Sequence, residues 1–171
     1  MKKAFLLFSF LLIGLLAIAQ NPCPQVIPAL QEWKGSKGTL HFPAQGSIII
    51  NPSDETALAS TAAILKNDLK ELMGWEYTII TGKAKKDGIY LSLSEPDEQL
   101  GKEGYELSIL NKASIQAPTA QGVFWGTRTL LQMLYRQDAK LAKGTTRDWP
   151  EFPNRGFMLD VGRKFFTLDY L

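Results

Sequence analysis

Two stretches with helical periodicity, set among short strand-like runs, constrain the fold of this chain more than any other feature. The first stretch follows Asn51-Pro52, where Ser53 or Asp54 can cap a helix, and Gly74 is expected to end it. Its apolar residues recur at spacings of three and four, which places them on one helical face: Leu58, Ala62, Leu65, Leu69 and Leu72. A second helix is expected after Pro118-Thr119. Its predicted buried stripe is Val123, Phe124, Thr127, Leu130, Leu131 and Leu134.

The strand-like runs lie before, between and after these helices. Short apolar stretches at residues 26–27 and 47–50 suit strands, as do runs at 77–81, 89–93, 105–109 and 113–117. Alternation of apolar and polar residues indicates strands with one buried face. The lysine-rich turn 82–88 is of the kind that joins two antiparallel strands. We therefore predict an α+β domain over residues 20–137, with two helices on one face of a mainly antiparallel sheet.

Gly122 and Gly126 lie four residues apart on the second predicted helix. Glycines at this spacing remove side chains from one line of the helix, so the helix can lie close to the sheet. The pattern is not a phosphate-binding loop, because no strand followed by a glycine-rich turn and a lysine accompanies it.

The first 19 residues have the three parts of a signal peptide. Lys2 and Lys3 precede an apolar run, and the run closes on Ala17-Ile18-Ala19. The run is shorter than the roughly 20 residues that a transmembrane helix needs. Cys23 raises the alternative of a lipid anchor, but Asn21-Pro22 before it lacks the small residue that lipoprotein processing requires. We expect cleavage after Ala19 and a soluble exported protein, periplasmic or extracellular.

The charge of the mature chain excludes several partners. Removal of residues 1–19 takes away two lysines and leaves 17 basic against 17 acidic residues. A neutral chain has no field of one sign to attract nucleic acid or an acidic membrane. Cys23 and His41 are the only cysteine and the only histidine, so neither an internal disulfide nor a Cys/His metal cluster is expected, and no cofactor is implied.

The composition changes after residue 137. Residues 138–154 are polar and carry Gly144, Pro150 and Pro153, as is typical of a linker. Residues 155–161 then read as an apolar strand, and residues 168–171 as the start of a helix. One strand and a helix start cannot bury a core alone, so residues 155–171 are expected to begin a second unit.

One segment of this region reads Phe152-Pro153-Asn154-Arg155-Gly156-Phe157-Met158-Leu159-Asp160-Val161-Gly162-Arg163-Lys164-Phe165-Phe166. It resembles the opening of the catalytic barrel in the β-N-acetylhexosaminidases of glycoside hydrolase family 20. Residues 26–28, 104–109 and 121–132 resemble the accessory domain that precedes that barrel. Ala29-Leu30, where the family often repeats a proline, and Gly162, where serine or alanine is commoner, depart from the pattern.

The resemblance implies that residues 155–161 are the first strand of a truncated (β/α)8 barrel, a fold of about 250 residues with its site at the carboxyl ends of the strands. It assigns Arg155 to hydrogen bonds with the hydroxyls of the terminal sugar. Read from the residues alone, Arg155 would instead pair with a carboxylate at the barrel mouth. Asp160 and Arg163 suggest an acid and its partner, but an aspartate between Leu159 and Val161 is more often structural.

The resemblance also implies the reaction: hydrolysis of terminal β-linked N-acetylglucosamine or N-acetylgalactosamine from glycans with retention. In this family the 2-acetamido oxygen of the substrate attacks its own anomeric carbon, while a glutamic acid protonates the leaving oxygen and a neighbouring aspartate orients the acetamido group. That Asp-Glu pair would lie beyond Leu171. Asp54-Glu55 is an adjacent Asp-Glu pair, but its place at a helix start suits the helix dipole instead of catalysis.

Two alternatives remain open from the sequence. One is that the chain opens an enzyme of another glycosidase family with a similar accessory domain, a reading that the barrel-opening segment argues against. The other is a non-catalytic module that binds glycans or partner proteins.

Overall fold

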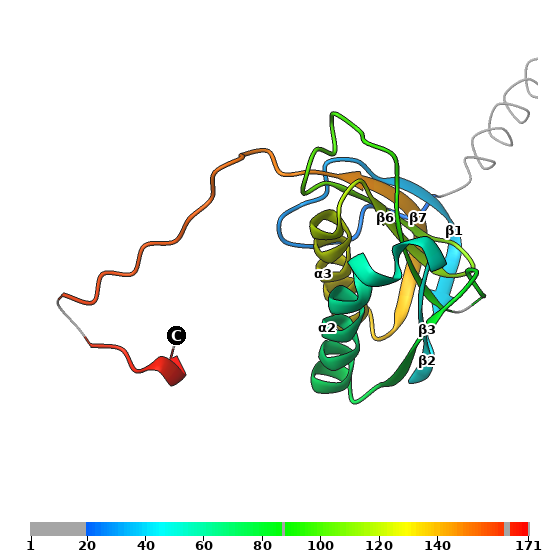
Figure 1. The fold of residues 1–171 in the computed structure, drawn as a ribbon, viewed down its shortest axis with the longest axis horizontal. Helices are drawn as coiled ribbons and strands as arrows, with labels where there is room; N and C mark the ends of the chain where they lie inside the picture. Colours follow the sequence, from blue (N-terminus) through cyan, green and yellow to red (C-terminus); the bar gives the residue numbers. More distant parts are fainter. Residues whose placement is uncertain (1–19, 87, 163–164, 171) are drawn as a thin grey trace, which may run out of the picture.

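The structure, a computed structural model, describes residues 20–86, 88–162 and 165–170. In these ranges one mixed sheet carries two α-helices on one of its faces (Figure 1). The α+β class and the placement of both helices on one face are thereby confirmed. The predicted signal peptide, residues 1–19, lies outside the described residues. Within the described ranges, no helix has the length and apolar character that crossing a bilayer requires.

The described sheet has seven strands in the order β1-β7-β5-β6-β4-β2-β3. The elements are β1 (Lys34–His41), β2 (Gln45–Ile50), η1 (Pro52–Asp54), α2 (Glu55–Met73), β3 (Glu76–Thr81), β4 (Ile89–Leu93), β5 (Tyr105–Ile109), β6 (Ala113–Ala117), α3 (Ala120–Arg136), β7 (Lys140–Asp148) and η2 (Leu168–Tyr170).

Helix α2 begins and ends close to its predicted limits. Gly74 follows it in the left-handed conformation, with φ of 70°, and its N–H bonds back to the helix, as in a glycine cap. Four of the five predicted stripe residues are buried, but Leu72 is 55% exposed. The Asp54 side chain makes no cap bond to the helix; its Oδ2 accepts from Leu93 N at 2.9 Å and from Asn51 Nδ2 at 2.8 Å. Asp54 therefore ties the helix start to strand β4.

The sheet is mixed, which corrects the mainly antiparallel prediction. β2 pairs in parallel with both β3 and β4, and β4 pairs in parallel with β6. Turn 82–88 is therefore not a hairpin, because β2 lies between the strands that it joins. The register explains how so short a connection suffices: Thr81 pairs with Ile50 and Ile89 with Ile48, so β4 starts near the level at which β3 ends.

The three consecutive isoleucines of β2 explain its central place. Ile48, Ile49 and Ile50 are all buried, as in a strand covered on both faces. Ile48 and Ile50 belong to the main core, whereas Ile49 lies against Gly88, where the connection from β3 reaches β4. A hairpin would have left β2 without one of its two neighbours.

Helix α3 lies close to the sheet at Gly122 and Gly126, as their spacing predicted. Thr119 caps the helix, since its hydroxyl accepts a hydrogen bond from Gly122 N at 3.0 Å. A Cβ placed on Gly122 would lie 2.3 Å from the carbonyl oxygen of Gly104, and one on Gly126 would lie 2.5 Å from Ile115 Cγ2. The predicted stripe of α3 is buried except for Phe124, which is half-buried.

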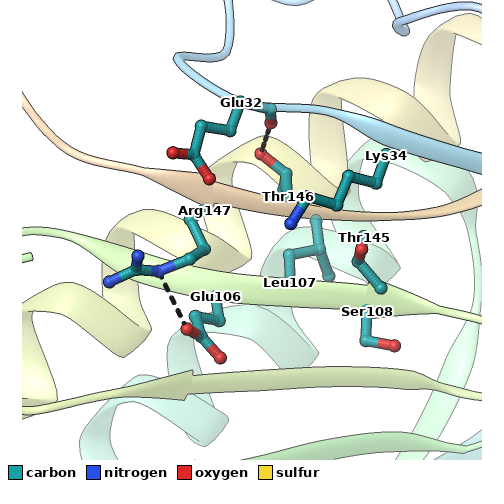
Figure 2. Close-up of a pocket in the computed structure, with 8 residues that line it drawn as sticks. All are labelled: Glu32, Lys34, Glu106, Leu107, Ser108, Thr145, Thr146 and Arg147. Atoms are coloured by element: carbon teal, nitrogen blue, oxygen red, sulfur yellow. Dashed lines mark hydrogen bonds and ion pairs between the residues drawn. The ribbon is translucent and has the colours of Figure 1, made fainter.

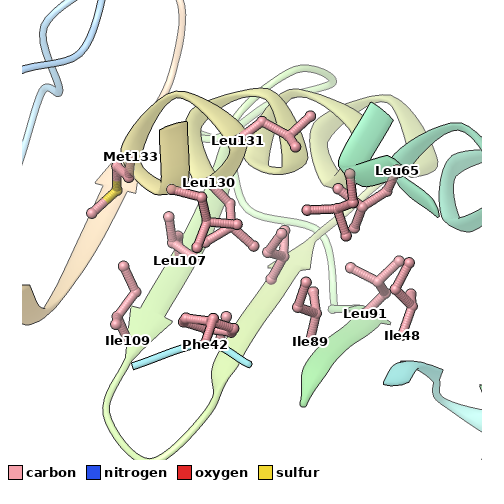
Figure 3. Close-up of a cluster of buried hydrophobic side chains, with 14 of the residues drawn as sticks. Phe42, Ile48, Leu65, Ile89, Leu91, Leu107, Ile109, Leu130, Leu131 and Met133 are labelled. Atoms are coloured by element: carbon pink, nitrogen blue, oxygen red, sulfur yellow. The ribbon is translucent and has the colours of Figure 1, made fainter. Parts of the chain in front are cut away.

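The core fills the space between the helices and the sheet (Figure 3). Leucines of both helices face apolar side chains from β2, β4 and β5. Among the labelled side chains are Leu65, Leu130, Leu131, Ile48, Ile89, Leu91, Leu107 and Ile109.

Strand β7 lies inside the range 138–154 for which the sequence predicted a linker. It pairs antiparallel with β1 and with β5, so it belongs to the domain. The sequence of β7 does not read as a strand, because its buried positions are Leu141, Gly144 and Thr146 instead of a run of large apolar residues. Gly144 is required where the strand passes Trp33, since a Cβ there would lie 2.3 Å from the indole ring.

The predicted barrel strand is not formed. Residues 155–161 are described but pair with no strand, and they run away from the sheet as an extended segment (Figure 1). A parallel barrel strand needs a neighbouring strand on each side to pair with its N–H and C=O groups. Among the described residues, no strand lies beside residues 155–161.

Buried tyrosines predict how the stability of the domain responds to alkali. Burial raises the pKa of Tyr77 to about 12, from an ordinary value of 10.0, and its hydroxyl donates to Pro43 O at 3.0 Å. Below pH 10 both states keep the proton; above pH 10 the unfolded state loses it first, so stability falls until pH reaches the folded pKa. We expect Tyr77 to contribute about 2–3 kcal/mol to that loss.

Urea unfolding at pH 8 and pH 11.5, on the wild type and Tyr77→Phe, measures this contribution. The phenylalanine variant loses the hydroxyl hydrogen bond at both pH values, but it should show the smaller drop between them. Equal drops in the two proteins would show that Tyr77 ionises as easily in the fold as in the unfolded chain.

Candidate functional site at the exit of the chain

Arg155, the predicted substrate-binding residue, lies where the chain leaves the domain. Its Nη1 donates to Phe152 O at 2.7 Å, and its Nη2 pairs with the Glu103 carboxylate. The structure therefore places it against a carboxylate of the loop before β5. Contact of Arg155 with a sugar stays a prediction.

This ion pair lies in a groove of about 620 Å³, which we call the exit groove. One wall is the N-terminal segment before β1, another is the outer side of α3, and a third is the chain after β7. Its lining residues are Ile27–Gln31, Glu103, Tyr105, Trp125, Arg128, Thr129, Gln132, Asp148–Phe152 and Arg155.

A partly buried hydrogen-bond network lines the exit groove. The Tyr105 hydroxyl donates to Asp148 Oδ2 at 2.7 Å, so the Thr129 hydroxyl, 2.6 Å away, donates to Tyr105. Asp148 Oδ1 accepts from Gln31 N at 3.0 Å. Burial, and then the Asp148 charge, raise the pKa of Tyr105 far above its ordinary value. Tyr105 therefore remains a neutral donor that fixes the carboxylate at the end of β7.

Gln132 fixes the N-terminal wall. Its Nε2 donates to Ile27 O at 2.9 Å, and its Oε1 accepts from Ile27 N at 3.0 Å. The side-chain amide thus pairs with both backbone groups of one residue, as a neighbouring strand would.

Arg128 links the groove to the other helix. Its Nη1 donates to Asp68 Oδ2 at 2.5 Å, and its guanidinium lies 4.7 Å from the centre of the Phe124 ring. Both charged side chains of the pair are about one quarter exposed, so the pair holds α2 and α3 together near the surface.

A smaller depression of about 260 Å³ opens over β5 and β7 (Figure 2). Arg147 pairs there with Glu106, Nε to Oε1 at 3.0 Å, and also with Asp97 at 2.6 Å. A hydrogen bond from Leu100 N, opposed by desolvation and assisted by the Arg147 charge, holds the pKa of Asp97 below its ordinary value. The lining charges neutralise one another across neighbouring strands, so this depression resembles a structural ion-pair cluster.

Acidic side chains line both depressions. In the part of the chain that the structure describes, no group of three His, Cys, Asp or Glu side chains could hold a metal ion. Asp148 and Glu103, two of the three carboxylates that line the exit groove, accept hydrogen bonds from Tyr105 and Arg155, and the third is Glu151. Sequence reasoning found Arg155 but missed Tyr105, Gln132 and Asp148, since their partners are 24 to 117 residues away in the chain.

The domain is similar to known proteins in both sequence and fold. Residues 23–149 match the family described as glycosyl hydrolase family 20, domain 2. The curated lacto-N-biosidase of Bifidobacterium bifidum is 31% identical over 150 residues, which cover 86% of this chain and 13% of that protein.

Solved structures agree with the sequence match. The β-N-acetylhexosaminidase of Streptomyces coelicolor A3(2) superposes with a TM-score of 0.68 at 28% identity, over 88% of this chain and 31% of that one. A Streptomyces plicatus β-hexosaminidase gives 0.66 at 27% identity, over 89% and 31%. The chain therefore spans less than a third of these solved relatives.

Proposed function

Because the chain belongs to glycosyl hydrolase family 20, we propose that it is the N-terminal part of a secreted β-N-acetylhexosaminidase. The family match over residues 23–149 carries the proposal, since it identifies the folded domain as the accessory domain of a glycosidase family. Segment 152–166, which resembles the opening of the family's catalytic barrel, follows that domain in the sequence.

The proposed reaction removes terminal β-linked N-acetylglucosamine or N-acetylgalactosamine from glycans. The 2-acetamido oxygen of the substrate attacks the anomeric carbon, and the configuration is retained after water opens the cyclic intermediate. The glutamic acid and aspartate that this reaction needs would follow Leu171. Arg155 is the one residue of this chain that we assign to the substrate, because a guanidinium offers several donors in a fixed plane and stays charged.

The reading frame after the codon for Leu171 tests the proposal. We expect several hundred further codons that encode the rest of the barrel and an adjacent Asp-Glu pair after a strand. A stop codon directly after Leu171 would remove the catalytic pair, and the chain would then be a non-catalytic module that binds glycans or partner proteins.

Export is a separate proposal, and it predicts the mature N-terminus. We expect the exported protein to begin at Gln20, because Ala17 and Ala19 supply the small residues that the peptidase needs. Peptide mapping of the exported protein measures the first residue. Ala19→Leu should block cleavage, whereas Ala4→Leu, in the apolar run, should leave it unchanged. A chain that begins at a lipid-modified Cys23 would contradict this prediction.

A further inference from the structure

Strand β3 forms one edge of the sheet and leaves part of its backbone without hydrogen bonds (Figure 1). Glu76 N donates to Ala44 O at 2.9 Å and Gly82 N donates to Ile50 O at 3.0 Å. In a parallel ladder, alternate residues bond to the same neighbour. The N–H and C=O groups of Tyr77, Ile79 and Thr81 therefore point away from β2, and no described residue pairs with them. Such an unpaired row is a template for another strand.

The opposite edge of the sheet is protected, and β3 is not. Strand β1 carries lysines, and its register with β7 shifts between Gly35 and Thr39. Asn21 covers its outer side, because its backbone N donates to Ser36 O at 3.3 Å and its Nδ2 to Gly38 O at 2.7 Å. Strand β3 contains no lysine or proline and pairs with β2 over six residues without a shift. It therefore lacks the features that keep an edge from pairing.

The outward-facing residues of β3 are complementary to a second copy of the same strand. Placing Ile79 opposite Ile79 of an antiparallel second copy brings Tyr77 of each chain opposite Thr81 of the other. All three outward-facing residues then pair, and because each such pair exchanges two hydrogen bonds, about six form in total. The Ile79 side chain, which is 37% exposed, would be covered by its counterpart.

The charges at the two ends of β3 favour the same antiparallel arrangement. In this register Glu76 of each chain lies opposite Gly82 of the other, next to Lys83. Both charged side chains are exposed, and Glu76 pairs with Lys70 at 3.1 Å with 61% of its side chain exposed. An exposed pair of this kind is weak, so the carboxylate can turn toward a second partner. A two-fold axis makes the contact between Glu76 and Lys83 twice.

We propose that β3 pairs antiparallel with β3 of a second copy of this chain, which joins the two sheets into one across a two-fold axis. The strand lies at the other end of the sheet from the point where the chain leaves the domain, since β5, β6, β4 and β2 separate it from β7. The pairing therefore uses no residue of the exit groove and does not depend on the proposed reaction.

Disulfide trapping on the complete protein tests this pairing. Single cysteines replace Ile79 or, as the matched control, Thr39, an exposed residue of the other edge strand, in a background where every other cysteine, Cys23 included, is serine. Residues opposite each other in a hydrogen-bonded antiparallel pair have Cα atoms about 5.5 Å apart, which a disulfide spans. With oxidised glutathione, we expect Ile79→Cys to form a covalent dimer at least ~10-fold faster than Thr39→Cys on a non-reducing gel.

Sedimentation equilibrium tests the register without a covalent bond, at protein concentrations up to about 500 µM because a short interface associates weakly. Ile79→Lys places like charges directly opposite each other and should raise the dimer Kd at least ~10-fold, whereas Thr39→Lys should leave it unchanged. Glu76→Lys should also weaken the dimer. Adding Lys83→Glu to Glu76→Lys should restore the Kd to within about threefold of the wild type, because the swapped charges meet again across the axis.

Three results would overturn the proposal. The first is a wild-type protein that sediments as a monomer over the whole concentration range, a measurement that needs no substitution. The second is equal cross-linking at positions 79 and 39, which would indicate random collision. The third is a Glu76→Lys defect that Lys83→Glu does not restore, since only contact between two copies brings these two ends of β3 together.

Discussion

Replacing Gly122 by alanine is expected to lower the free energy of unfolding by about 2–3 kcal/mol, although alanine is the better helix former by about 1 kcal/mol. The added methyl would lie 2.3 Å from Gly104 O and 2.7 Å from Ala117 Cβ. The first of these atoms is backbone that is held by the packing of β5, so the helix itself must move. Its movement would open the contact between α3 and the sheet.

Equilibrium urea unfolding, followed by far-ultraviolet circular dichroism, measures this loss. Gln121→Ala is the matched control, because Gln121 is exposed in the same turn of α3 and should change stability by less than about 0.5 kcal/mol. Gly126→Ala should also be destabilising, since its Cβ would lie 2.5 Å from Ile115 Cγ2 and 3.0 Å from Tyr105 Cδ2, both in the core. If Gly122→Ala were as stable as the wild type, helix propensity would decide the outcome and the close contact would play no part.

In the complete protein, Arg155→Ala is expected to lower kcat/KM for an aryl N-acetyl-β-glucosaminide by about 100-fold. Hydrogen bonds from a charged donor contribute about 1.5–3 kcal/mol each, and two lost contacts account for that factor. Steady-state kinetics with both the aryl glucosaminide and the aryl galactosaminide check the prediction.

Two variants separate this substrate role from a structural one. Glu103→Gln removes the partner that Arg155 has in the structure, and it should leave kcat/KM within about twofold. Arg136→Ala, at an exposed arginine near the end of α3, should likewise have no effect. If Glu103→Gln reproduced the loss caused by Arg155→Ala, Arg155 would act through its ion pair with Glu103 and not on the sugar.

The parts of the fold that follow local patterns were predictable from the sequence. Strands β4, β5 and β6 have the predicted limits, because their apolar residues face one core. Gly74 ends α2, and Gly122 with Gly126 admit the close approach of α3, since each glycine has a local steric role.

The parts of the fold that depend on partners distant in the sequence were not predictable. β1 and β7 pair mainly through their backbones; β1 buries only Leu40 and is irregular between Gly35 and Thr39. Neither strand therefore shows the apolar alternation that marks a strand in the sequence. The parallel pairing of β3 and β4 with β2 follows from three-dimensional register, which a short turn cannot indicate.

Only the part of the site that lies in a sequence motif was predictable. Arg155 stands in a recognisable segment, but the Tyr105–Asp148 and Gln132–Ile27 contacts join residues far apart in the chain. These contacts set the exit groove, and the sequence shows no local signal for them.

The most direct test of the central claim compares two substrates on the protein encoded by the complete reading frame. One is an aryl N-acetyl-β-glucosaminide, and the other is the aryl β-glucoside that lacks the 2-acetamido group. We predict rapid hydrolysis of the first and kcat/KM at least ~1,000-fold lower for the second, because the acetamido oxygen is the proposed nucleophile. Comparable hydrolysis of both substrates, or of neither, would contradict the assignment of this chain to a β-N-acetylhexosaminidase.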